Sequence, residues 1–238
     1  MDVAFDAGRQ ISMPLDMGWY NISFFRGAGF DVWLEADGIT TGTNIGGAGG
    51  TDVVEAMLDI AGHPGFVSLS DADFITYMNY GTLIAGINGI WNADRIQHDW
   101  GANFAVAPLP TFTVAGSQVQ MGGIIACVLV GVNAHSEQPE LAMLLAEWIT
   151  NYDSQVTRAI ERGEAPTNLA AATSSQLQGQ ANPALSALSA QSAYSAVFSA
   201  GGNFWTPMET LGATIAQGNP FGFDLQELLD NAVASITS

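Results

Sequence analysis

Thr82-Leu-Ile-Ala-Gly-Ile-Asn-Gly-Ile-Trp91 joins a short apolar run to an Asn-Gly pair and a tryptophan. The run has the length and aliphatic content of a buried strand, so residues 82–87 are predicted to form one. The Asn88-Gly89 pair that follows is typical of a tight turn, which presents Trp91. Upstream, Ser70-Asp71-Ala72-Asp73 has the capped, acidic start of a helix. A helix, a strand and a turn therefore follow one another in this part of the chain.

The preceding residues are predicted to begin with strands and turns and to end in a helix. Residues 1–50 have strand and turn character, with a strand expected at 1–5 and a hairpin turn at Asp37-Gly38. The glycine-rich stretch 46–50 lacks the lysine and the spacing of a phosphate-binding loop. It leads into Asp52-Val-Val-Glu55, which resembles a capping box and predicts a helix up to about residue 61.

The following residues add short strands and then become mainly helical. Strands are predicted at 103–107 and within 119–132, and the apolar run around Cys127 is interpreted as a buried strand. The Ala-, Ser- and Gln-rich segment 167–182 is predicted to be a loop or linker. The predicted helices span 139–149, 153–162, 183–199, 206–217 and 223–236. Strands that alternate with helices indicate an α/β fold.

Composition excludes some partners. The formal charge is −18 and the pI is near 4.1, so no basic surface is available for nucleic acid or for an anionic membrane. All five basic residues are arginines. The absence of lysine leaves two interpretations open, an engineered sequence and an unusual compositional bias. With Cys127 as the single cysteine, no internal disulfide forms, and the apolar run around it is too short to span a bilayer.

The motifs do not favour an enzyme, a metal centre or a cofactor site. His63, His98 and His135 are scattered without a zinc-ligand spacing. No serine lies in a nucleophile elbow, and no carboxylate pair stands apart as a glycosidase pair would. We therefore predict no catalytic residues, no metal ligands and no cofactor.

Several motifs occur in an order that is similar to a known family. The chain resembles the maltose/maltodextrin-binding branch of bacterial extracellular solute-binding proteins, the receptors of ABC sugar importers. The matching segments are Thr82 to Trp91, with its strand and Asn-Gly-x-Trp turn; 105–112, with Leu109-Pro110; the strand and helix of 122–149; and Asn203-Phe-Trp-Thr-Pro-Met-Glu209. The resemblance implies a type II periplasmic-binding-protein-like lobe, a mixed sheet flanked by helices, in an extracellular or periplasmic receptor whose parent protein could carry a lipid anchor.

The resemblance also implies a domain organisation. Residues 1–118 and 172–238 are expected to build the carboxy-terminal lobe, and 119–171 the segment that returns to the amino-terminal lobe. Because nothing resembles the start of that lobe, the resemblance implies a truncated receptor with weak or no sugar binding. The returning segment would then expose Ile124, Ile125, Val128 and Leu129, and self-association through this surface is expected.

Sugar binding calls for aromatic faces that stack on pyranose rings and for polar groups that bind hydroxyls. Trp33, Trp100 and Trp148 are interpreted as core or rim residues. Glu209 lies one helical turn beyond Trp205, where it either faces the same cleft or is a solvated acid near a helix start. The predicted ligand-binding residues are Trp19, Tyr20, Asn21, Trp91, Asn92, Trp205 and Glu209.

The predicted function is carbohydrate binding for an ABC permease. One alternative is an engineered fragment or scaffold with little or no ligand binding, which the absence of lysine favours. A second alternative is a glycoside hydrolase. Such an enzyme needs a pair of catalytic carboxylates, and no pair stands out in the sequence.

Overall fold

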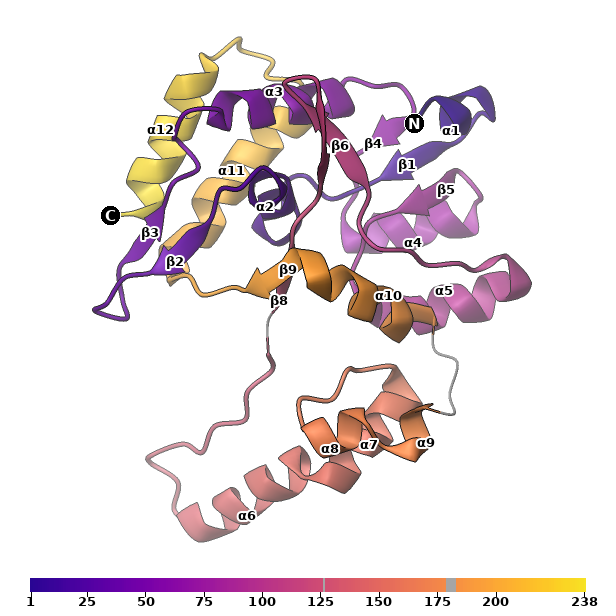
Figure 1. The fold of residues 1–238 in the computed structure, drawn as a ribbon, viewed down its shortest axis with the longest axis vertical. Coiled ribbons are helices and arrows are strands. Elements are labelled where there is room, and N and C mark those ends of the chain that lie inside the picture. Colours follow the sequence, from indigo (N-terminus) through magenta and orange to yellow (C-terminus); the bar gives the residue numbers. More distant parts are fainter. Residues whose placement is uncertain (126, 179–182) are drawn as a thin grey trace. The chain divides into compact units, whose positions relative to one another are not determined.

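The computed structural model describes residues 1–125, 127–178 and 183–238 (Figure 1). Within them the chain forms two compact units. Unit 1 comprises 1–88, 109–125 and 191–238, and unit 2 comprises the described residues of 89–108 and 126–190. Their correspondence to the two lobes of a receptor, with boundaries at 118/119 and 171/172, stays a prediction.

A parallel sheet lies at the centre of unit 1. Its strands are β1 (Gln10–Ser12), β4 (Phe66–Val67) and β5 (Leu83–Gly86), and they hydrogen-bond in the order β4-β1-β5. Helices α2 (Gly18–Gly27) and α3 (Gly50–Ala61) lie between β1 and β4 in the sequence, and α4 (Asp71–Asn79) connects β4 to β5. Parallel strands need such helical crossovers, so the predicted α/β class is confirmed, and so is the strand predicted at 82–87.

Helix α2 was missed by the sequence analysis, which assigned strand and turn character to residues 1–50. Seven of its ten residues are buried, and they include Tyr20, Asn21, Phe24 and Phe25. A helix buried on most of its circumference has no polar stripe, and so it lacks the 3.6-residue pattern by which helices are recognised. The predicted strand at residues 1–5 was also wrong, because α1 (Asp2–Asp6) is helical.

The carboxy-terminal helices α11 (Trp205–Ala216) and α12 (Leu225–Ile236) cover the core of unit 1, and α11 contacts α2, α3 and α12. The approach of α11 to the segment before α2 depends on Gly212. A Cβ at this position would overlap the carbonyl oxygen of Leu15 and would lie 2.5 Å from Nδ2 of Asn21. The Asn21 amide donates to the carbonyl oxygens of Leu15, at 3.0 Å, and of Met208, at 2.8 Å. The residue pair Asn21 and Gly212 therefore fixes the contact between α2 and α11.

Short strand pairs complete unit 1. Strands β2 (Val32–Leu34) and β3 (Thr41–Thr43) form the predicted antiparallel hairpin with its turn at Asp37-Gly38, and β6 (Thr111–Val114) pairs with β7 (Ser117–Gln120). Strand β8 (Gly123–Ile125) pairs in parallel with β9 (Ser195–Val197). At the β2–β3 turn, the Thr40 hydroxyl and the backbone N–H groups of Ile39 and Thr40 lower the pKa of Asp37 below its ordinary value.

The predicted start of α4 is confirmed, whereas the predicted start of α3 is not. Ser70 caps α4, because its hydroxyl oxygen accepts a hydrogen bond from the backbone N–H of Asp73 at 3.2 Å. Helix α3 begins three residues earlier than the capping box at Asp52 predicts, and its N-cap is Gly49 in the left-handed conformation at φ 90°. Asp52 therefore lies in the first turn of α3, where its negative charge interacts favourably with the positive end of the helix dipole and stabilises the helix.

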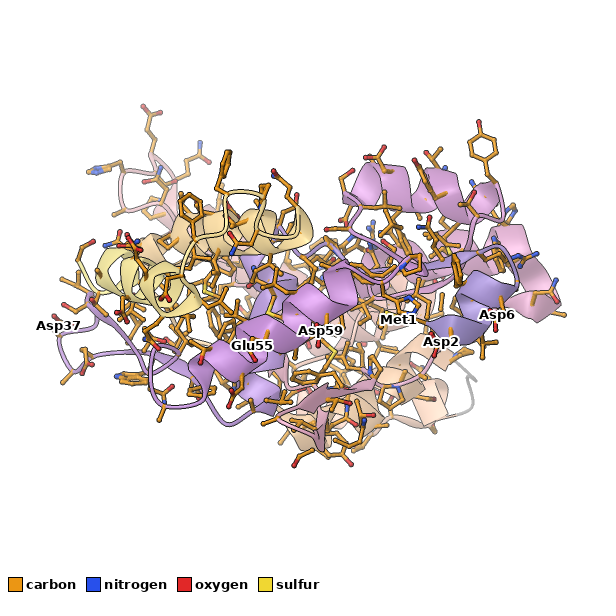
Figure 2. All side chains as sticks on the ribbon, turned by 90° about the horizontal axis from the view of Figure 1, so that it is seen from above. Met1, Asp2, Asp6, Asp37, Glu55 and Asp59 are labelled. Carbon is orange, nitrogen blue, oxygen red and sulfur yellow. The ribbon has the colours of Figure 1, made fainter. Side chains whose placement is uncertain are left out.

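Acidic side chains are exposed on several elements of unit 1. Figure 2 shows Glu55 and Asp59 on α3, Asp2 and Asp6 on α1, and Asp37 at the hairpin turn. These positions carry part of the formal charge of −18.

Unit 2 is mostly helical. After η1 (Ile90–Asn92), α5 (Ala93–Trp100) and η2 (Gly101–Asn103), it resumes with α6 (Pro139–Thr150) and α7 (Tyr152–Arg162). The predicted loop at 167–182 contains α8 (Leu169–Ala172) and α9 (Ser175–Gln178), while 179–182 lie outside the described residues. The helix predicted at 183–199 is shorter, since α10 (Pro183–Gln191) is followed by η3 (Ser192–Tyr194) and β9. The strand predicted at 103–107 is absent from the described structure.

Burial in unit 2 contradicts the buried strand predicted around Cys127 and, of the core or rim positions predicted for Trp148, the core one. Cys127 is exposed and does not lie in a strand, and Trp148 on α6 is 65% exposed, so neither is a core residue. Both predictions assumed that an apolar pattern finds a covering partner, which the described residues do not supply. The expected exposure of Ile125, Val128 and Leu129 is confirmed, whereas Ile124 is half-buried against the core of unit 1. Of the described helices, none is both long and apolar enough to cross a membrane.

Candidate functional site

A polar cluster lies where the chain leaves the parallel sheet of unit 1. Asp71 starts α4 shortly after β4, and Asn88 follows β5 by two residues. The Asp71 carboxylate oxygen Oδ1 accepts a hydrogen bond from Nδ2 of Asn88 at 3.0 Å and a long one from the hydroxyl of Tyr20 at 3.5 Å. Ligands of open α/β sheets bind outside the carboxyl ends of the strands. This cluster therefore lies at the carboxyl ends of the strands, where a ligand is expected.

Tyr20 and Asn21, both predicted to bind ligand, are buried on the first turn of α2. Tyr20 is 5% exposed, and its hydroxyl reaches Asp71. Asn21 is fully buried, and its amide nitrogen donates hydrogen bonds to two backbone carbonyls of unit 1. The structure thus gives Asn21 a packing role and leaves no part of its side chain at the surface.

An aromatic patch lies beside the amino-terminal end of α2. The rings of Trp19 and Trp205 are stacked at 16° with centroids 6.3 Å apart, and both are half-buried. Phe198 tilts against Trp205 at 5.8 Å, and the buried Phe204 meets Trp205 edge-on at 5.0 Å. We refer to Trp19, Phe198, Phe204 and Trp205 as the aromatic patch. Its two indoles are held by packing, and a ring held in this way is preorganised for stacking on a ligand.

A glycine allows the two tryptophans to meet. A Cβ on Gly18 would lie 3.2 Å from Cβ of Met208 and 3.6 Å from the ring of Trp205. The first distance is tighter than ordinary van der Waals contact and the second is an ordinary contact, so a side chain larger than alanine would push α2 away from α11. Gly18 therefore sets the spacing between Trp19 and Trp205.

Glu209 is exposed on α11, one turn beyond Trp205. Residues four apart on a helix lie on the same face, so its carboxylate lies on the side of α11 that carries Trp205. Among the described residues, its carboxylate has no hydrogen-bond partner or ion pair. An exposed carboxylate beside an aromatic face suits the hydroxyls of a saccharide.

Trp91 and Asn92 belong to unit 2, at η1. Trp91 is 58% exposed, and its indole lies so close to Gly89 that a Cβ there would overlap the ring. Asn92 is half-buried. The structure therefore brings Trp19, Trp205 and Glu209 together in unit 1, while the buried Tyr20 contacts Asp71 through its hydroxyl. Trp91 and Asn92 belong to unit 2.

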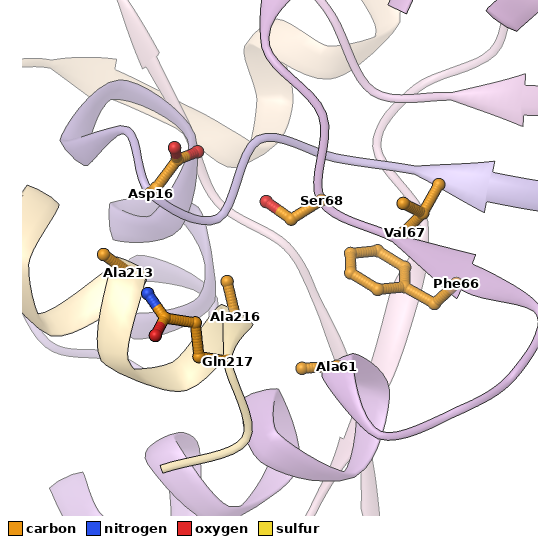
Figure 3. A pocket seen from close by; sticks show the side chains of 8 residues that line it. All are labelled: Asp16, Ala61, Phe66, Val67, Ser68, Ala213, Ala216 and Gln217. Carbon is orange, nitrogen blue, oxygen red and sulfur yellow. The ribbon is translucent and has the colours of Figure 1, made fainter. Parts of the chain in front are cut away.

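Two hollows of unit 1 lie away from the predicted residues. One, of about 380 Å³, flanks the edge strand β4 and is lined by Asp16, Phe66, Ser68 and Gln217 among others (Figure 3). Its lining includes three alanines from α3 and α11, and Asp16 is its charged group. A second, of about 540 Å³, follows α11 and α12. Neither offers a tryptophan, so both fit a stacked sugar ring less well than the aromatic patch does.

Asp71 and Asn88 were not predicted as site residues. From the sequence, Asp71 is expected at a helix start and Asn88 in a turn, and the structure shows both roles. What brings them together is the strand order β4-β1-β5. In the sequence, both residues follow predicted strand regions, which is the signal that could have indicated them. They lie close together only because β4 and β5 both pair with β1, and the sequence does not reveal this pairing.

Histidine and acidic side chains do not gather into a metal site in the described part of the chain. His63 Nε2 lies 2.7 Å from the Asp2 carboxylate, and His63 Nδ1 accepts from the N–H of Gly65 at 2.9 Å. These contacts tie α1 to the turn before β4, which is a structural role.

Comparison with known families identifies the group to which the chain is related. Residues 9–187, more than half of the chain, match the model of the bacterial extracellular solute-binding proteins. The chain belongs to this family. Solute-binding proteins of this family are binding receptors and not enzymes, in agreement with the motif analysis. A search of curated proteins gave no match.

Solved structures of solute-binding proteins share the fold. A maltodextrin-binding protein from L. casei BL23 without ligand is 23% identical with a TM-score of 0.78, and the match covers 98% of this chain and 64% of that one. The Thermus thermophilus maltotriose-binding protein bound with maltotriose is 18% identical with a TM-score of 0.76, over 97% and 61% of the two chains. A maltose-maltodextrin-binding protein of Alicyclobacillus acidocaldarius is 16% identical with a TM-score of 0.75, over 100% and 64%.

These similarities have two consequences. At such identities they establish the fold alone, which is that of periplasmic binding proteins. This solute-binding chain spans between 61% and 64% of the length of the three solved structures.

Proposed function

We propose that this chain binds a neutral oligosaccharide of the maltodextrin type and serves as part of the substrate receptor of an ABC importer. The observation that carries the proposal is the stacked pair Trp19 and Trp205, with Glu209 exposed one turn away. Aromatic faces bind the C–H faces of sugar rings, and carboxylates accept hydrogen bonds from sugar hydroxyls. Membership of the solute-binding family supports the same conclusion.

The residues have distinct roles in this proposal. Trp205 and Trp19 supply the stacking surface, and Glu209 accepts hydroxyl hydrogen bonds. Tyr20 acts through Asp71, because its hydroxyl helps to orient that carboxylate at the sheet edge. Trp91 and Asn92, which belong to unit 2, stay proposed ligand-binding residues of that unit. Asn21 is not part of the proposed site, since its amide is fully buried.

The proposal includes transport. A receptor of this family would capture sugar outside the cytoplasmic membrane, between two units that close, and pass it to an ABC permease. The formal charge of −18 suits a neutral ligand better than an anionic one, because acidic surfaces repel anions.

Maltotriose should bind weakly and saturably to this chain. A single preorganised stacking pair on a half-buried surface supports a dissociation constant of about 0.1–1 mM. This corresponds to a favourable free energy of binding of about 4–5.5 kcal/mol. Two-dimensional NMR of the indole N–H groups measures this directly, since the chain has six tryptophans. We expect the signals of Trp19 and Trp205 to shift on titration and the signal of Trp148 to stay in place.

Sorbitol at equal concentration is the control, because it has hydroxyls but no pyranose ring to stack. Equal shifts with both compounds, or no saturable shift with maltotriose, contradict the proposed function. Sub-micromolar binding would contradict the expected weak affinity.

We further propose that unit 2 mediates self-association. In α6, whose residues are all described, no residue is buried. Five of its large apolar side chains are 55–65% exposed, and Val128 and Leu129 nearby in sequence are 98% and 86% exposed. Exposed apolar patches of this kind favour association. The exposed apolar residues of α6 are Leu141, Met143, Leu144, Leu145 and Trp148.

Light scattering should therefore show a mass that rises with protein concentration and with added salt. Salt screens the repulsion between copies that each carry −18. Leu144→Glu should keep the chain monomeric at concentrations where the parent associates. Thr157→Glu adds the same charge at an exposed polar position of α7 and is the matched control. If both variants lower the mass equally, charge and not the apolar face of α6 governs association.

A further inference from the structure

In the division of the described residues, the chain crosses from one unit to the other at four places, which we call crossings. In the sequence they follow Asn88, Pro108, Ile125 and Ala190. Any motion of one unit against the other must be absorbed by the residues around these crossings. How firmly the crossing segments are held on the side of unit 1 therefore decides where such a motion can take place.

Three of the crossings are joined on the side of unit 1 by one side chain. Oε1 of Gln191 accepts a hydrogen bond from the backbone N–H of Leu109 at 2.8 Å, and Nε2 of Gln191 donates to the carbonyl oxygen of Met121 at 3.2 Å. Gln191 and Leu109 are the first residues of unit 1 after two crossings, and Met121 lies four residues before the third. Gln191 is 8% exposed, so its amide contacts are shielded from water.

The surroundings of Gln191 are built to receive it. Strand β8 precedes one crossing and pairs with β9, which follows another, in the register Gly123 with Ser195. A Cβ on Gly123 would overlap the Ser195 hydroxyl and would lie 3.3 Å from Nε2 of Gln191. Gly123 therefore leaves the space in which the Gln191 amide reaches Met121.

A second glutamine completes the arrangement. Nε2 of Gln120 donates to the carbonyl oxygen of Leu109 at 2.5 Å, while Gln191 holds the N–H of the same residue. Both backbone polar groups of Leu109 are thus bound by side chains of the neighbouring segments. The fourth crossing, after Asn88, is held separately by the hydrogen bond between Asn88 and Asp71.

We propose that Gln191 is a positioning residue of a hinge, which gathers three crossing segments into one rigid anchor on unit 1. The units then move as bodies, and the change in backbone angles is confined to the residues beyond the anchor. This inference rests on the proposed function insofar as a receptor that closes on its ligand needs such a hinge. Its physical basis, one buried amide that bridges two backbone segments, is independent of the sugar.

Gln191→Met tests the inference, because methionine keeps the length of the side chain but forms neither hydrogen bond. The half-buried N–H of Leu109 then loses its side-chain partner, and the carbonyl oxygen of Met121 keeps only the long contact with Nε2 of Gln120 at 3.5 Å. Both losses favour movement of the two segments apart. Spin labels at cysteines replacing Asp37 in unit 1 and Glu147 in unit 2, in a Cys127→Ser background, report the distance distribution between the units. We expect Gln191→Met to broaden this distribution about twofold.

A second label pair, at Asp37 and Asp59, lies within unit 1 and should keep its distribution. Gln118→Met is the matched control, since Gln118 is exposed and bonds only within the β6–β7 pair among the described residues. An unchanged distribution between the units, or broadening of both pairs, overturns the inference, the latter because it would assign Gln191 to the folding of unit 1. The experiment uses no sugar, so a failure of the proposed function in the maltotriose titration leaves its outcome unaffected.

Discussion

Gly212→Ala should lower the free energy of unfolding by about 3 kcal/mol, which is roughly a hundredfold in the ratio of folded to unfolded protein. The added Cβ would overlap the carbonyl oxygen of Leu15 and crowd the Asn21 amide. A backbone oxygen cannot rotate away as the end of a long side chain can. The α2–α11 contact must therefore open, and the two hydrogen bonds of Asn21 must lengthen or break.

Urea unfolding followed by far-ultraviolet circular dichroism measures this difference. Gly202→Ala is the matched control, because a Cβ on Gly202 meets no described atom within 4 Å. The control should change the free energy of unfolding by no more than about 0.5 kcal/mol. Equal effects of the two substitutions would show that α11 does not depend on close approach at Gly212.

Trp205→Ala should weaken maltotriose binding at least about tenfold, a loss of about 1.4 kcal/mol or more. The substitution removes one stacking face and also the ring that supports Trp19. Because the Trp19 side chain is still present in this variant, the shift of its indole signal reports on any remaining binding. The tenfold loss should appear as a titration curve moved to higher maltotriose concentration.

Two variants separate binding from folding. Trp148→Ala removes an equally large, exposed indole from unit 2 and should leave the affinity unchanged. Trp205→Phe keeps an aromatic ring on α11 and should bind with intermediate affinity. If Trp205→Ala binds as tightly as the parent chain while its circular dichroism is preserved, the aromatic patch is not the sugar site.

Local signals predicted the elements whose ends are determined locally. The Asp37-Gly38 turn and the Ser70 cap each depend on a few neighbouring residues, and both are present in the structure. Helix α2 was missed because its burial results from contacts with distant residues, such as the bond from Asn21 to Met208. The same cause explains Cys127 and Trp148, whose apolar neighbours predicted burial but whose surroundings do not cover them.

The candidate site was predictable in part. The resemblance to sugar receptors indicated Trp91 and Trp205 most directly and Trp19 less closely. The structure stacks Trp19 with Trp205 and assigns Trp91 to unit 2, and the role of all three in binding stays a prediction. Asp71 and Asn88 could not be predicted as a pair, because their contact follows from the order of three parallel strands. Strand order depends on long-range packing, which a local pattern does not encode.

The contact between α2 and α11 also bears on how the chain is synthesised. The hydrogen bond from Asn21 to Met208 spans 187 positions, which a ribosome takes about 10–40 s to add at ordinary rates. For that time the apolar residues of α2 have no α11 to cover them, and unit 1 cannot close its core. Such high contact order slows folding and exposes nascent chains to aggregation. A bound chaperone during translation is therefore most valuable between the emergence of residue 27 and that of residue 216.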